Sequence, residues 1–491
     1  MDEFGVVLRG GRVIDPESGL DAIRDVAIVG GRVAAVGTSL AAGHAEFDVS
    51  GQVVTAGFVD LHSHCYDIGS LRLRAMDGVT TALELESGVT PVRAAYASAA
   101  AEGRPVNYGF ASSWAMARMS VLAGTRLDGS VRTFFTHAAG PEWQRAASRD
   151  EQERILARLE ADLADGALGI GVMAGYAPSA DPGEYLRVAA LAARAAMPTY
   201  THARDIAEFR PETLVDGAEE IVRAAGETGA HMHYCHVNST TLRHADRVLG
   251  LVERAQREGA GISTEAYPYG AGMTGIGAAF LAPERLRERD LNPRDLIYAP
   301  TGEQIADAAR LAELRAADPG GLVIIRQLDE SDAGDRALLM RYLLFPGAVV
   351  ASDAMPLTWT GAADPEAWPL PRGAFTHPRT AGTFSRAVRM LTRHGGGVSL
   401  AEALAKCSLH PARLLEEHVP AMRRKGRLAA DADADVVVFD PETISDQSTY
   451  TASTRPSTGI RHVLVNGTFV VRDGQLVPGA RPGRPIRSAP A

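Results

Sequence analysis

Hydrophobic and polar positions alternate at both ends of the chain. The runs at residues 5–15, 25–37 and 43–57 alternate, and Gly-Gly interrupts the first two. A period of two indicates half-buried strands, and a glycine pair between such runs favours a tight hairpin. The pattern returns at residues 434–441 and 459–477. We therefore predict one small β-sandwich domain built from both chain termini.

The middle of the chain follows a different pattern, in which short apolar runs alternate with helical periodicity. Residues 150–166 and 181–196 are two of the predicted helices. The eight predicted strands are residues 58–64, 81–87, 106–112, 168–174, 197–203, 231–238, 261–269 and 347–354. Eight strands that alternate with helices predict an α/β fold, a (β/α)8 TIM barrel.

These patterns divide the chain into four parts. Residues 1–54 and 416–478 are the two parts of the β-sandwich, and residues 55–415 form the barrel domain. Residues 479–491 are rich in proline, arginine and alanine, so we expect a flexible tail there.

Composition narrows the partners and the location. The 491 residues carry 50 basic and 60 acidic side chains without a long basic run, which argues against nucleic acid as a partner. No apolar run is long enough to span a membrane, and the first twenty residues lack the apolar core of a signal peptide. The three cysteines are widely spaced, as expected for reduced thiols in a cytoplasmic protein.

The predicted strand ends carry imidazoles and carboxylates, and active sites of such barrels lie at the carboxyl ends of the strands. In the segment GFVDLHSHC, residues 57–65, alternation places Asp60, His62 and His64 on one face. Two imidazoles on one face can share a metal ion. Other strand ends carry Glu84, Glu86, His202, His236 and Asp353.

Each of these residues also has a structural interpretation, such as an arginine partner for Glu86 or a helix N-cap for Asp353. His231 and His233 fall on the opposite face from His236 and are interpreted as structural. An acidic or imidazole side chain inside a barrel is costly unless it is paired or metal-bound. Five strand ends of this kind together predict a divalent metal centre.

With these motifs the chain resembles the amidohydrolase superfamily, in its branch of D-aminoacylases and N-acyl-D-glutamate deacylases. The resemblance covers nearly the whole chain. It rests on the following segments in the family's order: GFVDLHSH, DGVTTALELESG, GALGIGVMAGYAP, THARD, HVNST, AYPYGAG, SDAMP, HPRTAGTFSR, and GRLAADADADVVVFDP followed by VLVNG. It implies a metal-dependent hydrolase of amide bonds other than peptide bonds, with residues 55–415 as the catalytic domain.

The resemblance also implies roles for single residues. The implied metal ligands are His62 and His64 for one ion, His202 and His236 for a second, and Asp353 beside the first. Asp353 is also the implied general acid/base. Arg379 is implied to hold a substrate carboxylate, and Tyr269 to form a hydrogen bond with the substrate.

Two positions depart from the family's pattern. A bridging carboxylated lysine is excluded because no lysine precedes Lys406. Where D-aminoacylases carry a cysteine, this chain has Ser87, and alternation favours Glu86 as the bridging ligand, with Glu84 as the fallback. A hard carboxylate in place of a thiolate moves the metal preference from Zn²⁺ toward Mn²⁺, Fe²⁺ or Co²⁺. Asn238 replaces a lysine of the substrate pocket, which opens the usual specificity to question.

The expected reaction is hydrolysis of a linear amide, foremost deacylation of an N-acyl-D-amino acid, by a metal-activated water with Asp353 handling the proton. A cyclic-amide hydrolase and a specialised natural-product amide hydrolase remain alternatives, and a non-catalytic barrel is a remote one. The expected partner is a small amide that bears a carboxylate, and the expected cofactor is Zn²⁺. The sequence does not determine whether one or two ions bind or whether the chain forms a homo-oligomer. The segment at residues 355–376 holds Trp359 and Trp368, and either an aromatic lid or a surface insertion accounts for it.

Overall fold

A parallel eight-stranded sheet forms the centre of the molecule in this computed structural model, which describes residues 4–359, 364, 366–393 and 397–488. Its strands, in spatial and chain order, are β6 (Phe58–Asp60), β7 (Val79–Val89), β8 (Asn107–Ser113), β9 (Ile170–Met173), β10 (Thr199–His202), β11 (Met232–Tyr234), β12 (Ile262–Ala266) and β17 (Val349–Val350). Each predicted apolar run overlaps one of these strands. The predicted TIM barrel is therefore confirmed.

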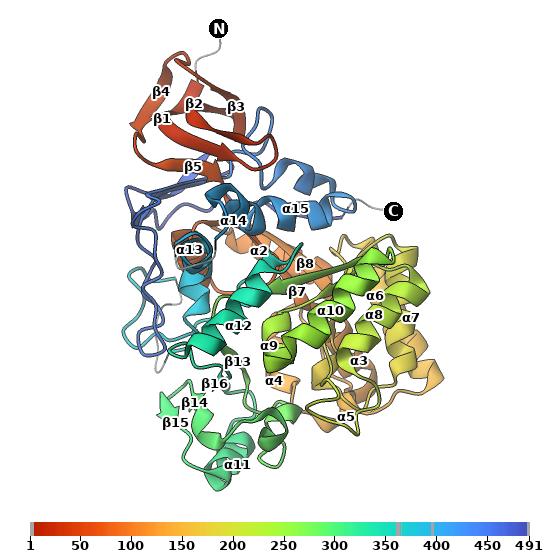
Figure 1. Cartoon of the computed structure of the whole chain (residues 1–491). Helices are drawn as coiled ribbons and strands as arrows, with labels where there is room; N and C mark the ends of the chain where they lie inside the picture. The colour runs from red at the N-terminus through yellow and green to blue at the C-terminus, as the bar shows by residue number, and fades with distance from the viewer. Residues whose placement is uncertain (1–3, 360–363, 365, 394–396, 489–491) are drawn as a thin grey trace.

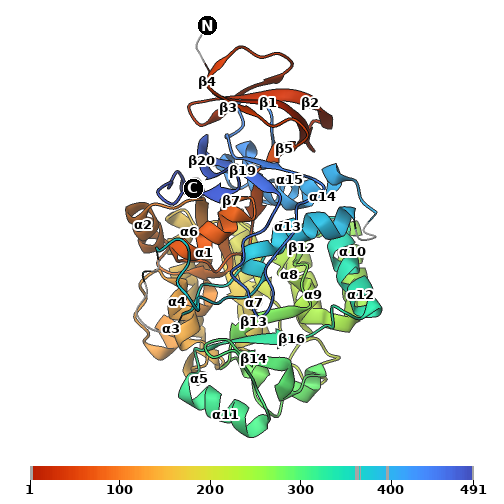
Figure 2. The ribbon, with the colours of Figure 1, turned by 90° about the vertical axis from the view of Figure 1, so that its left-hand side faces the viewer.

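Helices surround this sheet (Figures 1 and 2). They are α1 (Ile68–Met76), α2 (Val92–Glu102), α3 (Trp114–Ala123), α4 (Val131–His137), α5 (Pro141–Gln144), α6 (Arg149–Ala164), α7 (Pro182–Arg194), α8 (Gly217–Thr228), α9 (Val237–Thr241), α10 (Ala245–Arg257), α12 (Ala333–Leu344), α13 (Arg379–Thr392), α14 (Leu400–Cys407) and α15 (Leu409–Glu416). Helix α6 begins at a capping box in which the Ser148 hydroxyl accepts from the Glu151 amide and the Glu151 carboxylate accepts from the Ser148 amide. Such reciprocal bonds satisfy two otherwise unpaired donors.

The β domain is built from both ends of the chain, as predicted. Its strands are β1 (Phe4–Asp15), β2 (Leu20–Val29), β3 (Arg32–Gly37), β4 (Gly43–Asp48), β5 (Val53–Ala56), β18 (Val436–Phe439), β19 (Ile460–Val465), β20 (Thr468–Arg472) and β21 (Gln475–Leu476). They form one continuous nine-stranded sheet in which β18 pairs with β5. Strands β1, β2, β18 and β19 share one apolar core. This domain covers the amino-terminal end of the barrel (Figure 1).

A second small sheet lies at the opposite, carboxyl end of the barrel (Figures 1 and 2). It belongs to a long insertion between β12 and β17 and consists of β13 (Ala271–Gly275), β14 (Leu296–Tyr298), β15 (Glu303–Gln304) and β16 (Leu322–Arg326), with α11 (Ala308–Ala317) beside it. We call β13–β16 the lid sheet. These four strands are not among the elements predicted from the sequence.

Polar contacts close the barrel where the strand ladder is open. Strands β6 and β17 are not paired directly, but Asp60 joins the chain segments that continue them. Its carboxylate accepts from the Ser352 amide at 3.0 Å, the His62 amide at 3.2 Å and the Arg74 guanidinium at 2.7 Å. Asp60 and Arg74 are completely buried. The ion pair therefore fixes the ends of two strands that both carry predicted site residues.

Removal of Arg74 tests this closure. Arg74→Met leaves the Asp60 carboxylate buried without its cation, which we expect to lower the free energy of unfolding by about 3–5 kcal/mol. Denaturant titration measures the change. The control is Glu153→Ala, which removes an exposed i,i+4 pair with Arg149 and should change stability by less than about 0.5 kcal/mol. Equal stability of both variants would contradict a closing role for the pair.

The carboxyl-terminal segment packs against the barrel, so the expectation of a flexible tail is wrong for residues 479–488. Ile486 is buried, and its amide donates to the Tyr108 carbonyl at 2.7 Å. The Tyr108 amide in turn donates to the Arg484 carbonyl at 3.1 Å. Backbone hydrogen bonds and one buried apolar side chain therefore hold this segment against the barrel, although its composition is typical of a flexible tail. Residues 489–491 lie outside the described part.

Three further features bear on the sequence predictions. No described helix is long and apolar enough to cross a membrane. All three cysteines are free. Both lysines are buried: the Lys406 ammonium donates to the Phe345 and Ala348 carbonyls, and Lys425 pairs with Asp433 and Asp435 at the junction of the barrel and the β domain.

Candidate metal centre

The Glu86 carboxylate lies at the centre of four imidazoles at the carboxyl end of the barrel. Its Oε2 is 3.2 Å from His62 Nε2 and 3.7 Å from His64 Nε2. Its Oε1 is 2.6 Å from His236 Nε2 and 3.2 Å from His202 Nδ1. Each oxygen thus faces one pair of histidines, which is the arrangement of a carboxylate between two cations.

The spacing of these atoms suits divalent metal ions. Two ligand atoms at about 2.1 Å from a tetrahedral ion are about 3.4 Å apart, and His62 Nε2 and His64 Nε2 are 3.1 Å apart. Two compact ligand groups result: His62, His64 and Glu86, and Glu86, His202 and His236. A third group contains His62, His236 and Asp353.

The charge of the site also fits a cation. Burial lowers the pKa of a histidine. Nevertheless, the negative charges of Glu86, Glu265 and Asp353 raise the pKa of His62 well above its ordinary value. The pocket therefore draws positive charge, which a divalent ion supplies while the imidazoles stay neutral ligands.

Further side chains hold the imidazoles in place through their other ring nitrogens. His64 Nδ1 is 2.8 Å from Glu84 Oε2, and His236 Nδ1 is 3.0 Å from the Ser239 hydroxyl. His62 Nδ1 contacts the Glu265 carboxylate. These contacts leave the Nε2 atoms of the three rings directed at Glu86 or at one another. Glu84, the fallback in the sequence analysis, lies behind His64 and not between the histidine pairs.

Backbone strain places two of these residues. His236 has a φ of 26° and Asp353 a φ of 50°, in the left-handed region that non-glycine residues rarely adopt. Both residues follow a barrel strand directly or closely, at the ends of β11 and β17. The turned backbone at His236 brings its ring into the site although strand alternation would point it away from the barrel interior. Strain of this kind is concentrated at functional sites.

Asp353 lies beside the first histidine pair. Its Oδ1 is 3.5 Å from both His62 Nε2 and His64 Nε2, and its Oδ2 is 2.9 Å from the Arg379 guanidinium. Burial opposes ionisation, but the positive charge of Arg379 keeps the pKa of Asp353 below its ordinary value. The carboxylate is therefore ionised near neutral pH and can accept a proton.

Arg379, Tyr269 and Asn238, the three predicted substrate contacts, do not line the cavity beside the histidines in this structure. Arg379 is completely buried against Asp353. Tyr269 points away from the metal centre, with its hydroxyl 3.5 Å from the Pro378 carbonyl; Tyr267, two residues earlier, lines the cavity in its place. Asn238 donates to the Tyr267 carbonyl at 3.4 Å and accepts from its amide at 3.3 Å. Asn238 therefore holds Tyr267 and does not face the cavity.

A cavity of about 50 Å³ opens beside the histidines. Its walls combine apolar side chains with polar and charged ones, and the lid sheet supplies several of them. Besides His64, His202 and His236, the lining residues include Phe135, Met173, Tyr176, Met273, Thr274, Phe280, Arg289, Ile325 and Gln327. Small-molecule pockets usually offer about 300–1,000 Å³, so an acylated amino acid needs more room than this cavity offers.

The predicted aromatic lid is not part of this cavity. Trp359 and Trp368 pack around Leu73, Leu357 and Ala381 in a separate apolar cluster. From residues 355–376, only Met355 of the described part lines the cavity; residues 360–363 and 365 lie outside the described part. The residues that cover the metal centre come instead from the insertion between β12 and β17.

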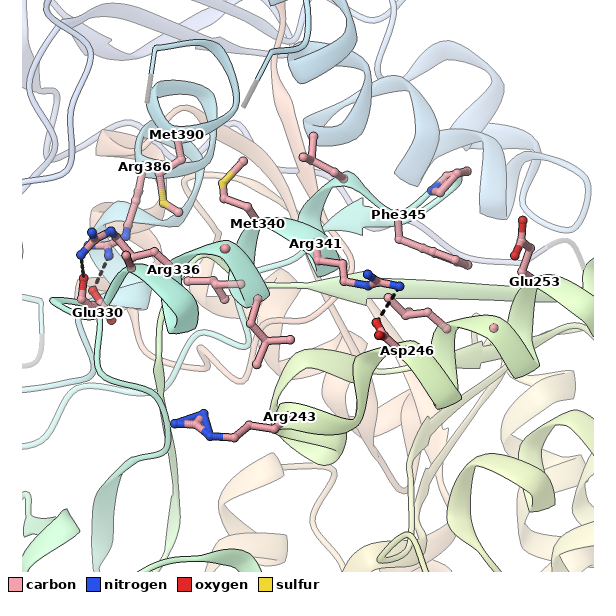
Figure 3. A pocket seen from close by; sticks show the side chains of 18 of the residues that line it. Arg243, Asp246, Glu253, Glu330, Arg336, Met340, Arg341, Phe345, Arg386 and Met390 are labelled. Atoms are coloured by element: carbon pink, nitrogen blue, oxygen red, sulfur yellow. Dashed lines mark hydrogen bonds and ion pairs between the residues drawn. The ribbon is translucent and has the colours of Figure 1, made fainter. Parts of the chain in front are cut away.

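A much larger groove, of about 1460 Å³, lies on the outside of the barrel between α10 and α12 and the end of α13. Figure 3 shows its walls, along which the ion pairs Arg341–Asp246 and Arg386–Glu330 run. None of the metal-ligand groups found among the described residues lies in this groove. The chemistry is therefore assigned to the smaller cavity.

Sequence reasoning missed Glu265, Ser239 and Tyr267. Glu265 carried a usable signal, since an acidic residue in the apolar strand ISTEA needs a buried partner. Ser239 follows His236 by three residues, a spacing that a helical turn brings together. The choice of Tyr267 over Tyr269 depends on the path of the chain after β12, which the sequence pattern does not specify.

Comparison with known proteins gives a consistent result. Residues 45–471 match the amidohydrolase family. The chain is 30% identical to a D-aminoacylase of Alcaligenes xylosoxydans xylosoxydans over 98% of this chain and 97% of that protein. It is 29% identical to an N-acyl-D-glutamate deacylase of the same organism over 99% of this chain and 97% of that protein.

A solved structure shares the fold over the full length. It is an N-acyl-D-glutamate deacylase from Bordetella bronchiseptica in complex with zinc and a phosphonate inhibitor. The TM-score is 0.76 at 24% identity, and the match covers 99% of this chain and 100% of the other.

Proposed function

Because this chain belongs to the amidohydrolase family, we propose that it hydrolyses the amide bond of an N-acyl-D-amino acid with one or two bound divalent ions, Zn²⁺ foremost. The observation that carries this proposal is the Glu86 carboxylate between the pairs His62/His64 and His202/His236, with Asp353 beside it. The named activities of the similar deacylases support the substrate class and its D configuration.

The proposed ligands are His62, His64, Glu86, His202, His236 and Asp353. When bound, the metal supplies Lewis-acid activation of a water molecule and of the amide carbonyl. Asp353 takes the proton from the attacking water and returns it to the leaving nitrogen, the work of a general base and then a general acid. Arg379 holds the Asp353 carboxylate in position at 2.9 Å.

The same arginine supports a substrate that carries a carboxylate. Arg379 Nε and Nη1 have no hydrogen-bond partner among the described residues, so the three N–H donors on these two nitrogens remain when Nη2 pairs with Asp353. A guanidinium can hold two carboxylates at once because its five donors point in different directions. We infer that a substrate carboxylate reaches these donors past Tyr267 once the lid sheet has moved.

The cyclic-amide alternative gains no support from the site. Its usual bridging carboxylated lysine has no equivalent, because Lys406 and Lys425 are the only lysines and both lie outside the metal centre. A carboxylate takes the bridging position here.

The test combines metal analysis with matched substrates. The purified protein is analysed for metal and then assayed for amine release from N-acetyl-D-glutamate, N-acetyl-D-leucine and their L forms. Ring opening of dihydroorotate and hydantoin, the cyclic controls, releases no free amine and is followed through the ureido product. We expect bound divalent metal and activity with one of the D substrates. Activity with the cyclic amides alone would overturn the proposed substrate class, and a protein that binds no metal would overturn the mechanism.

A further inference from the structure

A continuous line of hydrogen bonds runs down the interior of the barrel from the metal centre. Glu265 Oε1 contacts His62 Nδ1, and Glu265 Oε2 lies 3.1 Å from His233 Nε2. His233 Nδ1 lies 2.7 Å from the Ser263 hydroxyl, which is 2.8 Å from His231 Nε2. We call these four residues, Glu265, His233, Ser263 and His231, the axial column.

The axial column crosses the barrel from one end to the other. Its side chains come from β11 and β12 and from His231, which directly precedes β11. Glu265, His233 and Ser263 are buried, whereas His231 is half-buried at the amino-terminal end of the strands. The His233 ring also packs edge-on against Tyr200 of β10, with ring centroids 5.9 Å apart. The column is thus held on its sides as well as at its ends.

Each hydrogen bond of the axial column can be assigned a donor and an acceptor, starting from the carboxylate of Glu265. An ionised carboxylate only accepts, so the hydrogens lie on His62 Nδ1 and on His233 Nε2. His233 Nδ1 then accepts from the Ser263 hydroxyl, whose oxygen accepts from His231 Nε2. His231 is neutral in this assignment, which agrees with the burial that lowers its pKa to about 4.

Glu265 connects both halves of the metal centre. Besides His62 Nδ1, its Oε1 accepts from the backbone amide of His236 at 3.1 Å. No arginine or lysine pairs with Glu265 among the described residues; its ion-pair partners are His62 and His233. A fully buried carboxylate without a permanent cation is costly, and a metal ion held by His62 would compensate its charge.

We propose that Glu265 is a positioning residue for the metal ligand His62, and that His233, Ser263 and His231 fix the carboxylate of Glu265 for this task. This inference rests on the proposed function, because it takes His62 as a ligand. Glu265 keeps the proton of His62 on Nδ1, so that Nε2 presents its lone pair to the metal. Outer contacts of this kind change metal affinity by about 10–100-fold.

The experiment measures metal affinity directly, by competition with a chromophoric chelator. For Glu265→Ala we expect an affinity about 10–100-fold below that of the parent, and for Glu265→Gln a loss of less than about 10-fold, because the amide oxygen still accepts from His62. The visible absorption of the Co²⁺ form reports the coordination geometry and should change in Glu265→Ala and return toward the parent in Glu265→Gln.

The lower part of the column has a matched pair of variants on one strand. Ser263→Ala removes both hydrogen bonds of the Ser263 hydroxyl and should weaken metal binding about 3–10-fold, within the range of outer contacts. Thr264→Val is its control, since the buried Thr264 hydroxyl has no partner among the described residues and points to the other face of the strand. It should bind metal within about twofold of the parent.

Three outcomes would overturn the inference. Parent-like affinity and Co²⁺ absorption in Glu265→Ala would remove Glu265 from the positioning role. If that variant does not fold, parent-like affinity in Ser263→Ala has the same meaning. A parent protein that binds no metal would refute the proposed function together with the inference, so the two failures remain distinguishable.

Discussion

Replacement of Glu86 by alanine is expected to abolish hydrolysis and to reduce the bound metal from two ions per chain to one or none. Each oxygen of Glu86 faces a different histidine pair, at 2.6–3.7 Å from the ring nitrogens, so the variant removes one ligand from each ion at once. A metal ion contributes several kcal/mol of transition-state stabilisation. We therefore expect kcat/KM to fall at least about a thousandfold.

The matched control for Glu86→Ala is Glu84→Gln on the same strand. Glu84 contacts His64 Nδ1 from behind, so its amide should keep both ions and reduce activity by about 10–100-fold. Elemental analysis and an amine-release assay measure both variants, and circular dichroism checks the fold. Two ions per chain in Glu86→Ala would show that another residue bridges them; one ion in both the parent and Glu86→Ala would indicate a mononuclear site.

Asp353→Asn is expected to lower kcat by about 10²–10⁴-fold, because it removes the group that accepts and returns the proton. The asparagine side chain occupies the same space and can still accept from Arg379, so the protein should fold and retain metal on the second histidine pair. The kcat of the metal-loaded variant, measured beside its metal content, tests this. A variant with full metal and nearly normal kcat would assign the proton transfer to another group.

The dependence of kcat on pH provides a second test of the role of Asp353. Asp353 acts as a base only when ionised, so activity falls as the pH drops through its pKa. Arg379 holds that pKa below its ordinary value. In Arg379→Met the pKa rises, and the acidic limb of the kcat profile should move to higher pH. An unchanged limb in this variant would mean that the limb reports a different group.

Much of this site follows from the sequence because its elements are local. Strand alternation alone places His62 and His64 of the His-x-His motif on one face of their strand. It likewise places Glu84 and Glu86 of the LELE segment on one face of the next strand. The carboxyl ends of parallel strands meet at one end of a barrel, so residues from five strands converge once the barrel is recognised. The eight strands and the β domain could be predicted on the same grounds.

The rest depends on long-range packing that no periodic pattern encodes. Alternation does not predict the turned backbone at His236 and Asp353, nor the 2.9 Å contact that joins Arg379 to Asp353. The lid sheet consists of short strands from a long insertion, which resemble ordinary loops in the sequence. The packed tail depends on the burial of one residue, Ile486, against the barrel; composition cannot reveal such a contact.

Because both lysines are buried, reaction at a lysine side chain reports that the protein has opened locally. Lys406 and Lys425 are 3% and 2% exposed, so a lysine-specific protease or an amine-reactive dye finds no lysine on the folded protein. Cleavage after Lys406 requires the contact with the chain before β17 to open, and cleavage after Lys425 requires the junction with the β domain to separate. When reclosing is fast, the rate of each cut follows the equilibrium population of its open form. Mass spectrometry of the fragments would therefore rank the local stability of two regions in one unlabelled sample.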